Sequence, residues 1–243
     1  MNQTANYQFT IVVPVYNEQD NIKRLELELA KFIGSTTYKS CVIFIDDGSK
    51  DESKNLLMEV CHRHENMFYL SFFKNEGLTA ALKAGIDYTF SEYVGYIDAD
   101  LQTSPSDFNL LLKYVKDYAM VMGIRVGRKD GLVKRFSSKF ANEFRRIMTN
   151  DVAIDTGCPL KIIKTEYAKR IPFFTGMHRF LPALISLQEG GTYKQVPISH
   201  FARIAGQSKF HLWNRLFGPL GDCFVYRWMK RRYINYRVES LHI

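Results

Sequence analysis

The sequence predicts an α/β fold with a mostly parallel central sheet. Short apolar runs of strand length alternate with amphipathic helical stretches through the first half of the chain. Their spacing suits strand–helix–strand units with right-handed crossovers. The chain has 243 residues, of which 46% are hydrophobic and 24% charged, which suits a large globular domain.

The first predicted strand, Phe9–Val15 (FTIVVPV), is apolar throughout, as expected for a parallel strand buried on both faces. A helix from about Asp20 to Ile33 follows, with Ile22, Leu25 and Leu29 on one face. The alternation continues with further elements: strands at Cys41–Ile45, Met67–Phe73, Tyr93–Ile97 and Ala119–Gly123, and helices from Asp51 (as N-cap) to Val60, Gly77 to Phe90 and Pro105 to Tyr118.

The pattern changes after Gly123. A basic loop at Arg125–Gly131 and a basic amphipathic helix at Lys134–Met148 come first. We then expect a strand near Leu160–Ile163, a helix at Phe180–Leu187 and a strand at Thr192–Ile198. An aromatic, basic tail begins at Phe210. Gly218-Pro219 is expected to kink or divide the tail. We therefore predict a catalytic domain over residues 1–209 and a helical extension over residues 210–243.

An acidic cluster ends the strand at Tyr93–Ile97. Asp98, Asp100 and Gln102 stand at alternate positions, and Ser104-Pro105 is the N-terminus of the next helix. Carboxylate and amide oxygens are hard ligands suited to Mg²⁺ or Mn²⁺ carrying a nucleoside diphosphate. A D-x-D pair alone is more often a solvated turn. Here, however, acids also follow two earlier strands, at Glu18 and Asp46-Asp47, and the carboxyl edge of an α/β sheet is where ligands bind.

The net charge of +8 is concentrated between Arg125 and Arg146 and after Arg203. Such clusters are often solvated helix faces, but they also suit anionic phosphates or an anionic membrane surface. No nucleic-acid-binding module accompanies them, so we expect no nucleic-acid partner.

Several absences in the sequence predict a cytoplasmic protein. The four cysteines form no CxxC pair and are expected to be reduced. The N-terminus does not resemble a secretory signal, and no apolar run approaches the roughly 18 residues that span a bilayer.

Several motifs in order resemble the family 2 glycosyltransferases, which have the nucleotide-diphospho-sugar (GT-A, Rossmann-like) fold. They are VVPVYNE at Val12–Glu18, IDDGSKDES at Ile45–Ser53 and IDADLQTSP at Ile97–Pro105. The second half is similar to the polyprenyl-phosphate branch, which includes dolichyl-phosphate mannose synthase, through Gly123–Arg125, Lys134–Asn142 and Arg203–Phe210.

The resemblance implies roles for particular residues. Nucleotide-sugar contacts fall on Pro14, Tyr16, Glu18, Asp46, Asp47 and Asp98. Metal ligands fall on Asp98, Asp100 and Gln102. The catalytic set, which grips the donor diphosphate and the lipid phosphate, is Asp100, Arg125, Lys134, Ser138, Arg203 and Lys209, with Arg135 as an alternative to its neighbour Lys134.

The resemblance implies metal-dependent, inverting transfer of a sugar from a UDP- or GDP-sugar to a polyprenyl phosphate at the cytosolic membrane face. A phosphate monoester is already anionic near neutral pH, since its second pKa is about 6, so this acceptor needs cations and no general base. A glycan hydroxyl acceptor would need a carboxylate base, for which Asp155 is the best candidate. A catalytically silent scaffold that binds nucleotide sugars is a further alternative.

The tail carries Trp213, Phe224 and Trp228, followed by a basic end at Lys230-Arg231-Arg232. This composition suits peripheral docking on an anionic leaflet, while packing of the same aromatic residues as core is an equal alternative. A membrane partner subunit or a homo-oligomer is also compatible with the sequence.

Overall fold

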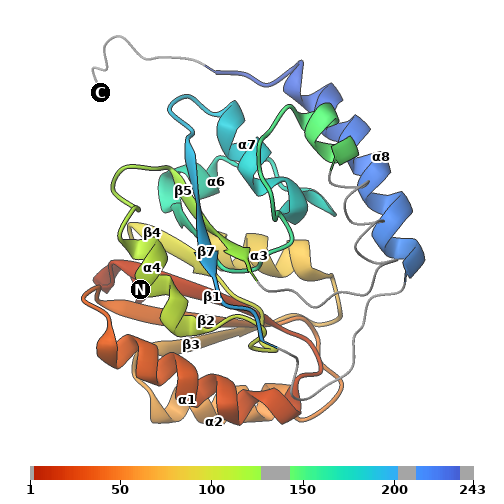
Figure 1. The fold of residues 1–243 in the computed structure, drawn as a ribbon. Helices are drawn as coiled ribbons and strands as arrows, with labels where there is room; N and C mark the ends of the chain where they lie inside the picture. Colours follow the sequence, from red (N-terminus) through yellow and green to blue (C-terminus); the bar gives the residue numbers. More distant parts are fainter. Residues whose placement is uncertain (1–2, 127–142, 202–211, 236–243) are drawn as a thin grey trace, which may run out of the picture.

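The structure is a computed structural model that describes residues 3–126, 143–201 and 212–235, with the side chains of residues 212–219 outside the description. Its centre is a seven-stranded sheet with strand order β3-β2-β1-β4-β6-β5-β7 (Figure 1). The strands are β1 (Phe9–Val15), β2 (Ser40–Asp46), β3 (Met67–Ser71), β4 (Tyr93–Tyr96), β5 (Met120–Arg125), β6 (Lys161–Lys164) and β7 (Tyr193–Ile198). The predicted α/β fold with a mostly parallel sheet is confirmed.

Strand β6 alone among these seven is antiparallel to its neighbours. It pairs with β4 in the register Tyr96↔Lys161 and Tyr93↔Lys164, and with β5 on its other side. Because β6 runs in the opposite direction, its first residue, Lys161, lies at the edge of the sheet where β4 ends. The loop before β6 therefore reaches the same edge as the carboxyl ends of the parallel strands.

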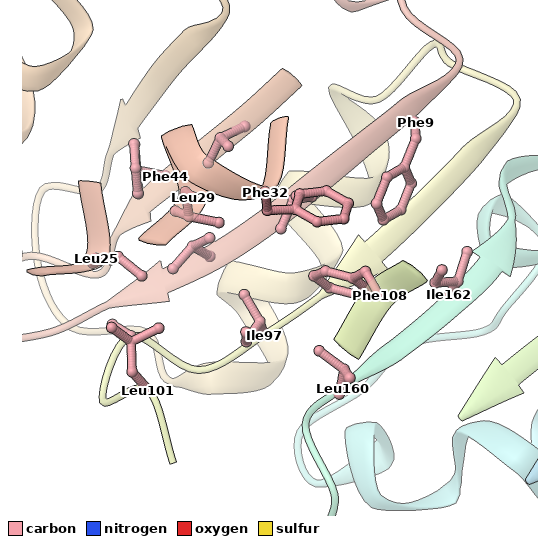
Figure 2. Close-up of a cluster of buried hydrophobic side chains, with 14 of the residues drawn as sticks. Phe9, Leu25, Leu29, Phe32, Phe44, Ile97, Leu101, Phe108, Leu160 and Ile162 are labelled. Carbon is pink, nitrogen blue, oxygen red and sulfur yellow. The ribbon is translucent and has the colours of Figure 1, made fainter. Parts of the chain in front are cut away.

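Two hydrophobic cores cover the two faces of the sheet. On one face, alternate residues of β1 pack against helices α1 (Gln19–Ser35), α2 (Ser53–Arg63) and α4 (Phe108–Leu112), and Figure 2 shows this cluster. Its centre is aromatic, with the rings of Phe9 and Phe108 edge to face at 5.2 Å between centroids.

The opposite core contains residues of helices α3 (Leu78–Asp87), α6 (Thr165–Lys169), α7 (Leu181–Leu187) and α8 (Leu212–Lys230). Residues 143–149, at the end of the predicted helix Lys134–Met148, are also helical, and three single-turn 3₁₀ segments are described: η1 (Gln3–Asn6), η2 (Pro105–Asp107) and η3 (Met177–Phe180). Both faces of β1 and β2 are thus buried, which explains their uninterrupted apolar sequences.

Some predicted boundaries are wrong. The helix expected over Pro105–Tyr118 is short, because η2 and α4 end at Leu112 and turns follow. The third strand stops at Ser71 rather than Phe73, and α3 stops at Asp87 rather than Phe90. Glu52, not Asp51, occupies the N-cap of α2, although Asp51 does accept a hydrogen bond from the backbone N–H of Ser53 at 3.0 Å.

Helix α8 runs without a break through Gly218-Pro219, so the expected division there is wrong. Its second half packs back on the domain. Tyr226 is 1% exposed, stacks on Phe180 at 5.9 Å and donates to the carbonyl of Ala183. The opposite side of the helix leaves Phe224 and Trp228 62% and 59% exposed. Of the helices described, none is both long enough and apolar enough to cross a membrane.

Candidate active site

The loops that follow β1 and β2 are joined by hydrogen bonds at the carboxyl edge of the sheet. The backbone N–H of Asn17 donates to Ser49 Oγ at 3.0 Å, and Asn17 Oδ1 accepts from the N–H of Lys50 at 2.7 Å. The N–H of Glu18 donates to Ser53 Oγ at 2.8 Å. Asn17 has φ 49°, a left-handed conformation that asparagine tolerates better than most residues. The segment that contains the predicted nucleotide contacts Tyr16 and Glu18 is therefore built against the second loop.

Pro14 lies near the end of β1, where the sheet opens. The pairing of β1 with β4 extends only to Val12, whereas the pairing with β2 continues through Val15. In a parallel strand, the backbone N–H and C=O of one residue point toward the same neighbouring strand. The backbone of Pro14 faces the side of β4, and the pairing with β4 has already ended at Val12. The missing N–H of the proline thus costs no ladder hydrogen bond.

Asp46 and Asp47 are both buried, and their carboxylates bind protein groups. Asp46 accepts from the N–H of Ser49 at 3.0 Å and from Ser71 Oγ at 2.7 Å. Asp47 accepts from the N–H groups of Glu76 and Gly77, at the N-terminus of α3. Burial raises the pKa of Asp47, although these N–H donors oppose the shift. Both residues lie where the nucleotide contacts were predicted, and both also hold the edge of the sheet together.

The acidic loop after β4 is strained and anchored. Leu101 has φ 51°, which is unfavourable for a residue with a branched side chain, yet it is 2% exposed in the core. The N–H of Gln102 donates to Asp100 Oδ1 at 3.1 Å. On the other side, Tyr96 Oη donates to Asp98 Oδ1 at 2.5 Å. The buried leucine thus holds the loop so that Asp98 and Asp100 share the end of one strand.

Electrostatics indicate that this loop suits a cation. Burial, together with the neighbouring charge of Asp100, raises the pKa of Asp98 to about 6, while Tyr96, Lys161 and Arg125 oppose the shift. A divalent cation would remove the repulsion between the two carboxylates. No group of three or more His, Cys, Asp or Glu side chains that could hold a metal occurs in the part of the chain that the structure describes. The predicted ligand set is smaller, with two carboxylates and the amide of Gln102.

Arg125, the last residue of β5, is bound by Asp155. Its Nε and Nη2 donate to the two carboxylate oxygens of Asp155 at 2.8 Å each, and its backbone N–H donates to Oδ2 at 3.2 Å. The two side chains are only 14% and 11% exposed. A carboxylate held by a guanidinium in this geometry is stabilised in its charged form and is a weak proton acceptor.

Lys161 is a member of this site that the sequence patterns did not indicate. It is 2% exposed, and its ammonium lies 5.6 Å from the ring centroid of Tyr96 and donates to the carbonyl of Cys158. The available signal in the sequence is a charged residue, Lys161, directly before Ile162 and Ile163, which are core residues of the strand KIIK.

The end of β7 lies beside the acidic loop. The backbone N–H of Phe201 donates to the carbonyl of Gln102 at 2.9 Å, and His200 Nδ1 lies 3.1 Å from the same oxygen. The parallel strands therefore bring the first eight predicted residues and Arg125 to one edge: Pro14, Tyr16, Glu18, Asp46, Asp47, Asp98, Asp100, Gln102 and Arg125. Lys134, Arg135, Ser138, Arg203 and Lys209 lie outside the described residues.

Comparison with known proteins decides the family. The model of the family "Glycosyl transferase family 2" matches residues 10–179, which include all nine of these predicted residues. The chain belongs to glycosyl transferase family 2. The family predicted from the sequence is thereby confirmed, and with it the class of enzyme, a glycosyltransferase.

Two curated relatives are similar over most of the chain. A dodecaprenyl-phosphate galacturonate synthase of Rhizobium johnstonii is 29% identical, covering 88% of this chain and 65% of the relative. An undecaprenyl-phosphate 4-deoxy-4-formamido-L-arabinose transferase of Edwardsiella ictaluri is 28% identical, covering 87% of this chain and 66% of the relative. The chain thus spans about two thirds of the length of these relatives, both of which are named for polyprenyl phosphates, as the resemblance to that branch predicts.

Solved structures confirm the GT-A fold. Glucosyl-3-phosphoglycerate synthase of Mycobacterium tuberculosis, in complex with Mn²⁺, UDP-glucose and phosphoglyceric acid, superposes with a TM-score of 0.68 at 16% identity, covering 94% of this chain and 81% of that chain. A mannosyltransferase of Pyrobaculum calidifontis, in complex with GDP-mannose and Mn²⁺, gives 0.63 at 17% identity, covering 93% and 64%. Both of these solved structures contain Mn²⁺ and a nucleotide sugar.

Proposed function

We propose that this protein transfers a sugar, with inversion, from a UDP- or GDP-sugar to a polyprenyl phosphate at the cytosolic face of a membrane. The observation that carries the proposal is the Arg125–Asp155 pair. It leaves the best candidate for a general base bound by a guanidinium at the edge where the acidic loop ends. The names of the two curated relatives support the same acceptor class.

A phosphate acceptor removes the need for a base. Its oxygen is already ionised near neutral pH and can form the new bond to the anomeric carbon while the bond from that carbon to the nucleoside diphosphate breaks. The displaced diphosphate leaves with the electron pair, and no proton has to be removed. The enzyme has to bring two anionic groups together, which favours cations over carboxylates at the reacting centre.

The described residues divide this work. Tyr16 and Glu18, which follow β1, and Pro14 near its end are proposed to contact the nucleotide. Asp46 and Asp47 hold the second loop and the N-terminus of α3 in place around it. Arg125 is proposed to meet phosphate oxygens, with Asp155 fixing the orientation of the guanidinium.

Asp98, Asp100 and Gln102 are proposed to hold Mg²⁺ or Mn²⁺. A bound divalent cation would neutralise the diphosphate as it leaves. Tyr96 orients Asp98 through its hydroxyl, and the buried Leu101 fixes the loop directly after Asp100.

The outer side of α8 is proposed to contact the membrane surface. Phe224, Val225 and Trp228 are exposed on this side while Cys223 and Tyr226 are buried on the other. The exposed residues Lys230, Arg231 and Arg232 follow, and the Arg232 guanidinium lies 4.8 Å from the Trp228 ring. Interfacial aromatics beside basic side chains suit an anionic leaflet, where the lipid acceptor is found.

The acceptor class can be tested with a matched pair of lipids. Purified protein with Mn²⁺ and a panel of UDP- and GDP-sugars is given a short polyprenyl phosphate or the polyprenol of the same length, and release of nucleotide is measured. We expect stimulation by the phosphate and none by the alcohol. Stimulation by the alcohol or by a glycan, abolished in Asp155→Asn, would instead establish the hydroxyl-acceptor alternative.

A further inference from the structure

Lys161 occupies a position in β6 where an apolar residue would be expected. Ile163 lies two residues after Lys161 on β6, and Val94 is the residue of β4 that pairs with Ile163. Both are core residues on the face of the sheet that Lys161 shares. Lys161 itself is 2% exposed. Burial of an ammonium group costs several kcal/mol unless other groups stabilise its charge. The position therefore calls for an explanation beyond packing.

Burial lowers the pKa of Lys161, while its contacts favour the charged form without an ion pair. Its Nζ donates to the carbonyl of Cys158 and lies 5.6 Å from the centroid of the Tyr96 ring, and both contacts stabilise a cation. Among the described residues, no carboxylate lies within 4.0 Å of this ammonium. Its charge therefore acts on the acidic loop across Tyr96, whose hydroxyl binds Asp98 at 2.5 Å.

Lys161 adds one positive charge beside the acidic loop. The carboxylates of Asp98, Asp100 and Asp155 and the guanidinium of Arg125 lie at the same edge of the sheet. Removing the charge of Lys161 makes this edge more negative by one charge. A more negative site attracts a free divalent cation more strongly and repels a diphosphate more strongly.

We propose that Lys161 is a positioning residue that sets the charge of this site, so that the site holds a divalent cation weakly alone and firmly together with a nucleoside diphosphate. The proposal rests on the nucleotide-sugar function proposed above. The lysine does not touch the donor. Its buried charge weakens the attraction for a bare cation and favours the complex of the cation with the nucleoside diphosphate, which is anionic at about pH 8 because the terminal phosphate is doubly ionised. A transferase that works this way would release the metal together with the nucleotide product.

The test is calorimetric titration of the wild-type protein and two variants at about pH 8, where Asp98, with a pKa of about 6, is ionised. Lys161→Met removes the buried charge with little change in volume. Lys164→Met is the matched control, because this lysine lies on the same strand at the opposite edge of the sheet and donates to the carbonyl of Lys116 at 2.9 Å. Each protein is titrated with Mn²⁺ alone, and then with UDP and with GDP in the presence of Mn²⁺.

We expect Lys161→Met to bind Mn²⁺ alone roughly tenfold more tightly, and the nucleotide with Mn²⁺ roughly tenfold more weakly, than the wild type. Lys164→Met should match the wild type in both titrations, and Lys161→Arg should restore both affinities. A structural defect would weaken both affinities together, so opposite changes are specific to the charge.

Affinities in Lys161→Met that are unchanged, or that both fall, would overturn the proposal. If Lys161→Met does not fold, Lys161→Gln carries the same comparison, since it removes the charge and keeps a donor for the carbonyl of Cys158. A wild-type protein that binds neither nucleotide with Mn²⁺ would overturn the proposed function as well. Wild-type binding with no change in the variant would overturn only the role of Lys161.

Discussion

Replacement of Asp155 should show whether this carboxylate acts as a base or as the partner of Arg125. Removing one partner of a buried ion pair leaves an uncompensated charge and costs about 3–5 kcal/mol. Since the two side chains are still 14% and 11% exposed, we expect Asp155→Ala to lower the free energy of unfolding by an amount near the lower end, about 3 kcal/mol. Urea denaturation measures this change. The exposed pair Lys83–Asp87, at 2.6 Å with both side chains 50% exposed, is the control, and Lys83→Ala should cost much less.

The catalytic consequence is best measured in a double-mutant cycle with Asp155→Asn and Arg125→Ala. If Asp155 acts only by orienting Arg125, each single change should lower kcat by about 10–100-fold, and Asp155→Asn should have almost no further effect once Arg125 is absent. Independent effects, with Asp155→Asn abolishing turnover in either background, would refute this reasoning and assign Asp155 the role of base. Unfolding of each variant is followed in parallel, so that loss of fold is not mistaken for loss of chemistry.

Three further predictions follow from the same geometry. Gly48→Ala should destabilise the fold by about 1–3 kcal/mol and weaken UDP or GDP binding, because Gly48 has φ +67° and a Cβ there would collide with the backbone of Lys74. Urea denaturation and calorimetry measure the two effects. Gly34→Ala is the control and should be nearly neutral in both assays, because a Cβ at Gly34 has open space around it. The double variant Phe224→Ser/Trp228→Ser should no longer co-sediment with anionic vesicles, while its Tm should be unchanged because both side chains are exposed. Tyr226→Ser, on the buried side of α8, should instead lower the Tm. If the double variant still co-sediments, α8 is not the membrane contact. A proton on Asp98, whose pKa is about 6, competes with the metal. The affinity for Mn²⁺, measured by calorimetry, should therefore be full at pH 7.5 and about tenfold weaker at pH 5. An affinity that is constant over this range would remove Asp98 from the ligand set.

Much of the parallel half of the fold could be predicted because each element there carries a local signal. The apolar run of β1 and the Ser104-Pro105 helix start are such signals, and Ser104 Oγ does accept from the N–H of Ser106. No local signal indicates the direction of β6, because a strand of four residues with the sequence KIIK fits a parallel and an antiparallel position equally well. That direction decides which end of β6 meets the site, so the place of Lys161 could not be predicted from the sequence.

The same contrast applies to the candidate site. The strand ends that carry Glu18, Asp46 and Asp98 could be found because parallel strands bring their carboxyl ends to one edge. The partner of Arg125 could not be found, since Asp155 is 30 residues away in the chain and the contact depends on how the loop before β6 folds back. Spacing indicates which residues reach the edge, and three-dimensional packing decides which of them remain available to a ligand.

The central claim is that a sugar is transferred to a lipid phosphate, and one measurement tests it most directly. Purified protein is incubated with Mn²⁺, radiolabelled UDP- and GDP-sugars and a short-chain polyprenyl phosphate, and the mixture is extracted into organic solvent. We predict that label from one donor enters the organic phase and that Asp100→Ala abolishes this transfer. Release of nucleotide with all label remaining in the aqueous phase would contradict the claim and assign the protein an acceptor other than a lipid phosphate.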